Sequence, residues 1–189
     1  MVNTQIRSLT SADYYQMMEI GIIREGEKVE LILGQIFTMA AKGTRHTLST
    51  RKLFKQLLAL LSDSADVQSQ DPITLPNNSE PEPDIVIAKL RSDDYANSHP
   101  TPADIILVIE VADSTIKFDR ETKAPLYAAA GISEYWIVNL IDNRLEIYRQ
   151  PEGSIYTSIQ IVTPPQSISL PQFPEIVVQI DDFFPAQKA

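Results

Sequence analysis

The chain has 189 residues, contains no cysteine and carries a net charge of −9 at pH 7. Its length suffices for a substantial core, and we expect residues 1–189 to form a single domain. The missing cysteines exclude disulfides, thiolate metal sites and cysteine nucleophiles. The acidic charge argues against a protein that coats nucleic acid without specificity. Because the sequence has neither the layout of a signal peptide nor an apolar run of about 18 residues, we expect a cytoplasmic protein outside the membrane.

The first part of the chain predicts a helix followed by a β-hairpin. Thr10, with Asp13 three residues later, is a variant of the capping box that begins helices. Residues 28–33 and 35–40 have the character of strands, and Gly34 between them favours a tight turn. Strand side chains alternate between two faces, so one face of the first strand is expected to carry Val29, Leu31 and Leu33.

Residues 46–62 give the clearest helical pattern. Their apolar side chains recur at helical spacing and predict one stripe, formed by Leu53, Phe54, Leu57, Leu58 and Leu61. Residues 31–62 contain no Asp or Glu. Four basic side chains of this stretch are candidates for docking a phosphate backbone, namely Lys42, Arg45, Lys52 and Lys55. A solvated helix face explains the same residues without any nucleic acid.

Buried strands dominate the middle of the chain. Residues 104–112 contain six Ile, Leu or Val in nine positions without polar alternation, as in the interior of a parallel or mixed sheet. Residues 85–88 and 135–140 have a similar character. Residues 114–131 are helical in pattern, with a kink or a late start expected at Pro125. Strand, helix and strand together predict a right-handed crossover between parallel strands.

Shorter strands complete the prediction at residues 67–69, 73–75, 145–149, 156–162 and 176–180. The sequence shows no internal repeat and no linker. The expected fold class is α/β, with a mixed central sheet flanked by helices and with additional β-hairpins.

Glu110 is the one charged residue inside the apolar run of residues 105–112. Burial of an unpaired carboxylate costs several kcal/mol, so Glu110 needs a cation, a hydrogen-bond network or a raised pKa. Desolvated carboxylates gather at functional sites. Glu110 is therefore the first candidate for function.

Asp84 and Lys123 complete a possible site around Glu110. If the strand after Asp84 lies beside the central strand, the two carboxylates can share Mg²⁺, which prefers one or two carboxylates, backbone oxygens and water. The carbonyl of Val111 is a natural third ligand. Such a metal lowers the pKa of a bound water and stabilises charge on a phosphate, while Lys123 orients that water and offsets its charge.

Several motifs resemble one known family. Pro83-Asp84 followed by Glu110-Val111-Ala112 is similar to the PD-(D/E)XK nuclease motif. A more specific similarity lies in five longer stretches: ELILG at 30–34, PDIV at 83–86, IEVADS at 109–114, KAPLY at 123–127 and GISEYWIV at 131–138. With them the chain, from about Thr10 to Phe184, resembles the Uma-type restriction endonuclease family of bacteria.

The resemblance implies a restriction-endonuclease-like fold and cleavage of phosphodiester bonds in DNA, with Mg²⁺ or alternatively Mn²⁺ as cofactor. Matched position by position, Asp84 and Glu110 are the metal-binding acids. The sequence departs from the superfamily pattern at Ala112, where a lysine is expected. Lys123 matches a lysine that has moved to the following helix.

Two further positions match the family. Glu30 matches an acidic position that assists the metal or accepts a hydrogen bond from its water, and His46 matches a recurrent position for which the residues alone suggest no role. A homodimer is expected, because a duplex has two strands to cut and most soluble oligomers are twofold symmetric.

Other interpretations stay open beside the nuclease. The acidic charge and Ala112 fit a catalytically inactive nuclease-like domain that binds nucleic acid or a protein partner. A buried ion pair between Glu110 and Lys123 with only structural meaning is a third interpretation.

Single residues also have simpler explanations. Lys123 sits one helical turn after Asp119 and could pair with it, and Glu30 could pair with a surface lysine. Tyr135 and Trp136, although suited to base stacking, lie in an apolar strand and are most simply core.

Overall fold

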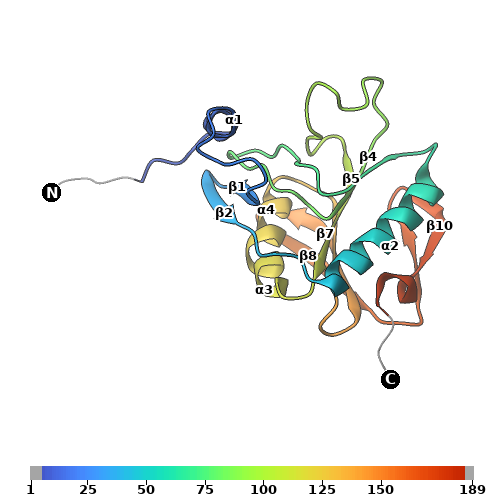
Figure 1. The fold of residues 1–189 in the computed structure, drawn as a ribbon. Coiled ribbons are helices and arrows are strands. Elements are labelled where there is room, and N and C mark those ends of the chain that lie inside the picture. The colour runs from blue at the N-terminus through green and yellow to red at the C-terminus, as the bar shows by residue number, and fades with distance from the viewer. Residues whose placement is uncertain (1–5, 186–189) are drawn as a thin grey trace.

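A six-stranded mixed sheet forms the centre of the computed structural model, which describes residues 6–185 (Figure 1). Its strands, in spatial order, are β3 (Asp66–Gln68), β4 (Ile85–Ala88), β5 (Ile105–Ala112), β6 (Glu134–Asn139), β7 (Arg144–Glu152) and β8 (Ile155–Val162). β5 and β6 are parallel, and the other neighbouring pairs are antiparallel. The predicted mixed α/β sheet is confirmed, with β5 at its centre.

The crossover from β5 to β6 consists of three short helical segments. They are α3 (Ile116–Phe118), the π-helical turn η1 (Asp119–Lys123) and α4 (Ala124–Ala129). The predicted helix over 114–131 corresponds to residues 116–129, which are helical without interruption, and the irregularity near Pro125 takes the form of the π-helical turn just before it. Pro125 stands in the first turn of α4, where its missing N–H costs least.

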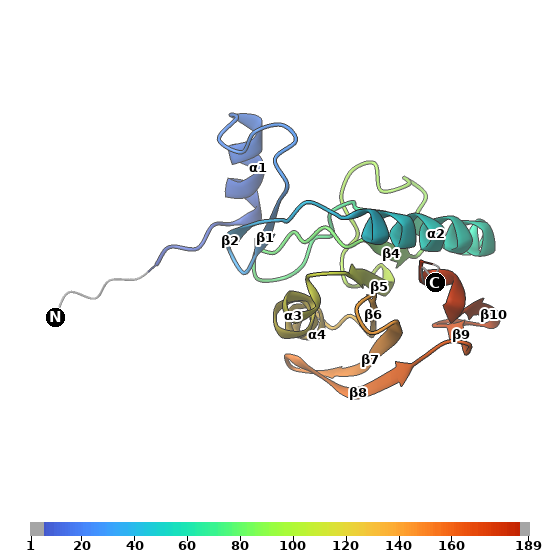
Figure 2. The same cartoon turned by 60° about the horizontal axis from the view of Figure 1, so that its bottom comes forward.

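Helices cover both faces of the sheet (Figure 2). α2 (Thr44–Leu61) packs Leu53, Leu57 and Leu61 against one face, and α4 lies on the other. Leu58 is 44% exposed, so the apolar stripe of α2 is narrower than predicted. Since alternate residues of β5 point to opposite faces, Glu110 shares the α4 face with Val108 and Ala112.

The hairpin of β1 (Val29–Ile32) and β2 (Gln35–Thr38) lies beside the sheet. Its turn places Leu33 at φ +50° and Gly34 at φ +74°, as a tight turn of the primed type requires. This turn leaves Leu33 54% exposed. The predicted strand over 28–33 therefore ends at Ile32, and Leu33 belongs to the turn rather than to the strand face of Val29 and Leu31.

All four side chains of β1 are buried, including that of Glu30. One edge of β1 pairs with β2, and Leu31 forms a bridge with Glu80 on the other side. α1 (Ser11–Glu19) precedes the hairpin and begins with the predicted capping box of Thr10 and Asp13. The N-terminal segment thus places one carboxylate in the protein interior.

The C-terminal part adds a second hairpin, β9 (Ser167–Leu170) with β10 (Phe173–Gln179), and the 3₁₀ turn η2 (Ile180–Phe183). β9 was not predicted. Residues 73–75 do not form the predicted strand, because their amides donate to two separate segments, one at Ser79 and Pro81 and the other at Pro100. No helix within residues 6–185 has the length and apolarity that a membrane crossing requires.

Candidate active site

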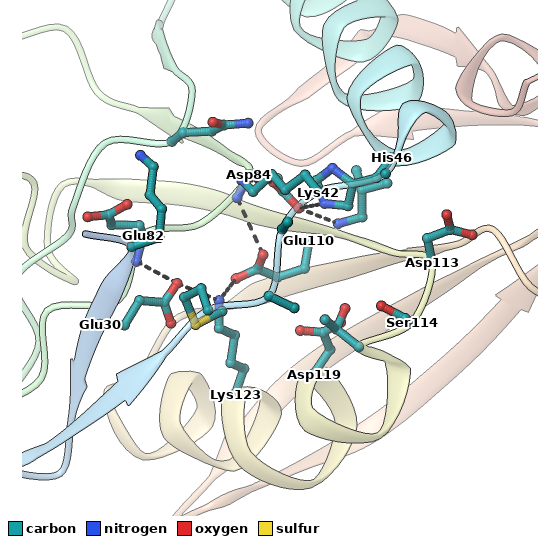
Figure 3. Close-up of a pocket in the computed structure, with 18 residues that line it drawn as sticks. Glu30, Lys42, His46, Glu82, Asp84, Glu110, Asp113, Ser114, Asp119 and Lys123 are labelled. Carbon is teal, nitrogen blue, oxygen red and sulfur yellow. Dashed lines mark hydrogen bonds and ion pairs between the residues drawn. The ribbon is translucent and has the colours of Figure 1, made fainter. Parts of the chain in front are cut away.

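A cavity of about 590 Å³ opens where β1, the loop of residues 39–43, α2, η1 and the adjoining ends of β4 and β5 meet (Figure 3). Nine charged side chains line it. Six are carboxylates, from Glu30, Glu82, Asp84, Glu110, Asp113 and Asp119, and three are lysines, Lys28, Lys42 and Lys123. The candidate residues Asp84, Glu110, Lys123 and Glu30 are thus brought to one place.

Glu110 accepts two hydrogen bonds at the same oxygen. Lys123 Nζ lies 2.8 Å and Tyr127 Oη lies 2.9 Å from Glu110 Oε1. Both donors come from the crossover, which covers the face of β5 that carries Glu110. The other oxygen, Oε2, faces the backbone amide of Asp84 at 3.4 Å. Tyr127 had no part in the predicted site, since its sequence neighbours suggest only a buried helix face.

Lys123 bridges two carboxylates that come from distant parts of the chain. Its Nζ is 3.1 Å from Glu30 Oε1 as well as 2.8 Å from Glu110 Oε1, and its side chain is 3% exposed. The simpler interpretation that Lys123 pairs with Asp119 is wrong for this structure, as is a surface lysine for Glu30. Among the described residues, Glu30 Oε2 is buried without a hydrogen-bond partner.

Ala112 and Lys123 are both neighbours of Glu110, Ala112 on the same strand and Lys123 on the crossover. Ala112 follows Glu110 by two residues on the same face of β5 and is fully buried with Ala124 and Tyr127 in one apolar cluster. A methyl group at position 112 leaves this face open to the crossover. The π-helical turn directly before Ala124 then carries the Lys123 ammonium to Glu110.

Asp84 has partners at both of its oxygens. Oδ2 accepts from the backbone amide of Val111 at 2.9 Å and lies 3.0 Å from His46 Nε2, while Oδ1 is 2.9 Å from Lys42 Nζ. His46 stands near the start of α2 and is buried, and its Nδ1 is 3.4 Å from Thr50 Oγ1. No role for His46 follows from the sequence alone, and the structure places its ring against Asp84.

These contacts set the charge state of Asp84. Burial of Asp84 opposes its ionisation, but the hydrogen bonds from His46 and from the Val111 amide, together with the Lys42 ammonium, hold its pKa below the ordinary value. Asp84 is therefore a carboxylate at neutral pH.

Glu110 and Lys123 each stabilise the charged form of the other. Burial raises the pKa of Glu110, and the adjacent Lys123 ammonium opposes that rise. Burial alone would lower the pKa of Lys123, but the carboxylates of Glu110 and Glu30 raise it well above its usual range. Lys123 is accordingly a permanent cation. Burial also raises the pKa of Asp119 to about 6.

The four basic residues predicted to dock a phosphate backbone lie in different surroundings. Lys42 enters the cavity. Arg45 donates to Asp113 at 3.0 Å and to the carbonyl of Leu140 at 2.6 Å. Lys52 and Lys55 are exposed on α2 and do not line the cavity.

Asp84 and Glu110 have the donor chemistry that a hard divalent cation requires. Within residues 6–185 no group of three or more His, Asp or Glu side chains converges closely enough to enclose a metal ion. Mg²⁺ does not need such a cage, because it commonly uses one or two carboxylates together with water and substrate phosphate. Glu30, with its unpartnered buried oxygen, adds a further donor at the same cavity. The residues present therefore fit Mg²⁺.

Comparison with known proteins supports the fold and shows the family. A crystal structure from Anabaena variabilis, described as "a putative nuclease belonging to DUF820", matches with a TM-score of 0.73 and 16% sequence identity, over 93% of this chain and 97% of that chain. At this identity the match establishes a shared fold. None of the curated proteins matches the chain. The Uma2 family, described as "Putative restriction endonuclease", matches residues 11–181. The chain therefore belongs to the Uma2 family.

Proposed function

We propose that this protein is a Mg²⁺-dependent endonuclease that hydrolyses phosphodiester bonds in DNA. The observation that carries the proposal is the meeting of Asp84, Glu110 and the buried Lys123 ammonium in one cavity. Membership of the Uma2 family supports the same reaction. A cytoplasmic location and a homodimer that acts on both strands of a duplex are part of this proposal.

Asp84 and Glu110 are the residues that would hold the metal, with the Val111 carbonyl and Glu30 as further oxygen donors. Mn²⁺ suits the same ligands. When bound, the metal ion polarises the phosphate and lowers the pKa of a coordinated water. Val111 also fixes Asp84, because its amide donates to Asp84 Oδ2.

Lys123 supplies positive charge rather than a base. An ammonium has three N–H donors, and Glu30 and Glu110 accept from two of them. The third is available for a water molecule or for a phosphate oxygen. Since the raised pKa keeps Lys123 protonated, it orients the attacking water and stabilises developing negative charge.

A second candidate function is a nuclease-like domain that binds nucleic acid or a protein partner without cutting. It is favoured by the completeness of the Glu30–Lys123–Glu110 interaction, which neutralises Lys123 without any metal. In that case the cluster is a structural ion pair. A homologous fold supports either function.

Titration calorimetry with Mg²⁺ and Mn²⁺ separates the two functions. The endonuclease is expected to bind either ion, and Asp84→Asn should abolish the binding heat. The matched control Asp113→Asn alters a carboxylate of the same cavity that pairs with Arg45 on its outer side, and it should retain binding. Absence of metal binding by the unmodified protein would favour the non-catalytic function.

A further inference from the structure

The two oxygens of Asp84 are held by partners of very different accessibility. Oδ2 is held by the amide of Val111 and by His46, both buried. Oδ1 is held by Lys42, whose side chain is 38% exposed. Figure 3 shows Lys42 and His46 approaching Asp84 together.

Lys42 is attached to a part of the chain that can release it at little cost. Residues 39–43 form the connection between β2 and α2 without regular structure, and residues 40–43 are exposed. Asp84 keeps the amide of Val111 and the ring of His46 as partners when Lys42 leaves, so its carboxylate is not left without hydrogen bonds. Lys123, by contrast, is almost fully buried between two carboxylates and has no comparable freedom.

The cavity has more carboxylates than lysines, so DNA binding there requires additional positive charge. Six carboxylates face three lysines there, so the cavity repels the phosphates of DNA until cations compensate the excess. A metal at Asp84 would meet the Lys42 ammonium at one of its two oxygens. Two cations compete for Oδ1, and the exposed one can leave.

We propose that Lys42 is an exchangeable cation, which occupies Asp84 Oδ1 in the free protein, yields it to the metal and then contacts a DNA phosphate beside the site. This inference rests on the proposed function and adds a substrate-binding step to it. Because Lys42 is freed only when the metal binds, metal and DNA each strengthen the binding of the other. Thermodynamic linkage makes this coupling reciprocal.

The first measurement is the affinity for Mg²⁺ by calorimetry without DNA. Lys42→Met removes the competing ammonium and should tighten Mg²⁺ binding about fivefold. Lys28→Met is the matched control, because Lys28 lines the same cavity and pairs with no carboxylate among the described residues. It should change the affinity by less than about twofold. Equal effects of both variants, or no effect of Lys42→Met, would overturn the exchange.

The second measurement is the affinity for a short phosphorothioate duplex, which resists hydrolysis, with and without Mg²⁺. Lys42→Met should weaken DNA binding about fivefold in Mg²⁺ but less than about twofold in EDTA, because without the metal Asp84 holds Lys42 away from the phosphates. An equal loss in both conditions would overturn the exchange. If the unmodified protein binds Mg²⁺ and cuts DNA, and Lys42→Met has the same affinities for Mg²⁺ and DNA, only the exchange of Lys42 is refuted and the proposed function stands. Absence of Mg²⁺ binding by the unmodified protein refutes both.

Discussion

Lys123 lies 2.8 Å from Glu110, although 13 residues separate them in the sequence and they belong to different elements. Glu110 points from the central strand β5, and Lys123 comes from the π-helical turn of the crossover. Because position 112 carries only a methyl group, the positive charge next to Glu110 is supplied by the crossover. The ionic cluster is therefore a tertiary feature, made by the packing of η1 on the sheet.

Lys123→Met should destabilise the protein by about 3 kcal/mol, because it leaves the buried carboxylates of Glu110 and Glu30 without their cation. Urea unfolding measures this loss. The triple variant with Glu110→Gln and Glu30→Gln removes the stranded charges and should recover most of the stability. If Lys123→Met alone proved neutral, the ammonium could not be holding both carboxylates.

Tyr127→Phe should weaken Mg²⁺ binding about tenfold, as is typical when a group that orients a metal ligand is lost. The Tyr127 hydroxyl fixes Glu110 by donating to Oε1 at 2.9 Å. Tyr156→Phe is the matched control, since it removes a buried hydroxyl that donates to the Ile132 carbonyl, away from the cavity. Both variants should lose similar stability, and only Tyr127→Phe should lose metal affinity. Equal metal affinities would show that Tyr127 has a purely structural role.

Acid should weaken the fold through Glu146. Burial opposes its ionisation, but hydrogen bonds from Arg120, Asn139 and Arg144 lower its pKa from the ordinary 4.5 to about 2. A lowered folded-state pKa stabilises the protein above the unfolded-state value, and this contribution is lost as the pH falls from about 4.5 to about 2. The contribution of Glu146 to the free energy of unfolding is on the order of 2 kcal/mol.

Unfolding free energies measured across this acid range test the contribution of Glu146. Glu146→Gln should flatten the pH dependence between about pH 5 and pH 2. Glu121→Gln, at an exposed position that pairs only loosely with Lys117, should leave it unchanged. A Glu146→Gln profile parallel to that of the unmodified protein would contradict the assignment.

Charge reversal of Lys52 and Lys55 should weaken DNA binding and reduce its dependence on salt. Each phosphate contact contributes about 0.9 to the slope of log K against log salt, so the loss is up to about 2. Fluorescence anisotropy over a range of salt concentrations measures the slope. Lys117→Glu reverses another exposed lysine, on α3, and should reduce the DNA affinity and the salt slope less. An unchanged slope would exclude Lys52 and Lys55 from the DNA interface.

The elements that depend on local pattern were predictable from the sequence. The capping box of Thr10, the turn at Gly34 and the buried run of β5 each follow from a few neighbouring residues, and each is present. The strand predicted at residues 73–75 is absent, because two apolar residues around Thr74 do not distinguish a short strand from a buried loop. The π-helical turn before Pro125 could not be predicted either, because a proline in a helical pattern indicates only a kink or a late start.

The candidate site was predictable to a lesser degree. Glu110 is conspicuous because a charge in an apolar run needs an explanation, and Asp84 follows from the adjacent strand. The partners that surround them could not be found in this way. Lys42, His46 and Tyr127 come from a loop and from two helices, and their approach depends on how these elements pack on the sheet.

Metal-dependent DNA cleavage by Glu110→Gln is the decisive measurement of whether Glu110 holds a catalytic metal. Gln keeps the shape of the side chain and can still accept from Tyr127, so circular dichroism should show an intact fold. The unmodified protein is expected to cut DNA in Mg²⁺ or Mn²⁺ and to be inactive in EDTA. Glu110→Gln should lower the rate by on the order of a thousandfold. Undiminished cleavage by this variant would show that Glu110 does not hold a catalytic metal.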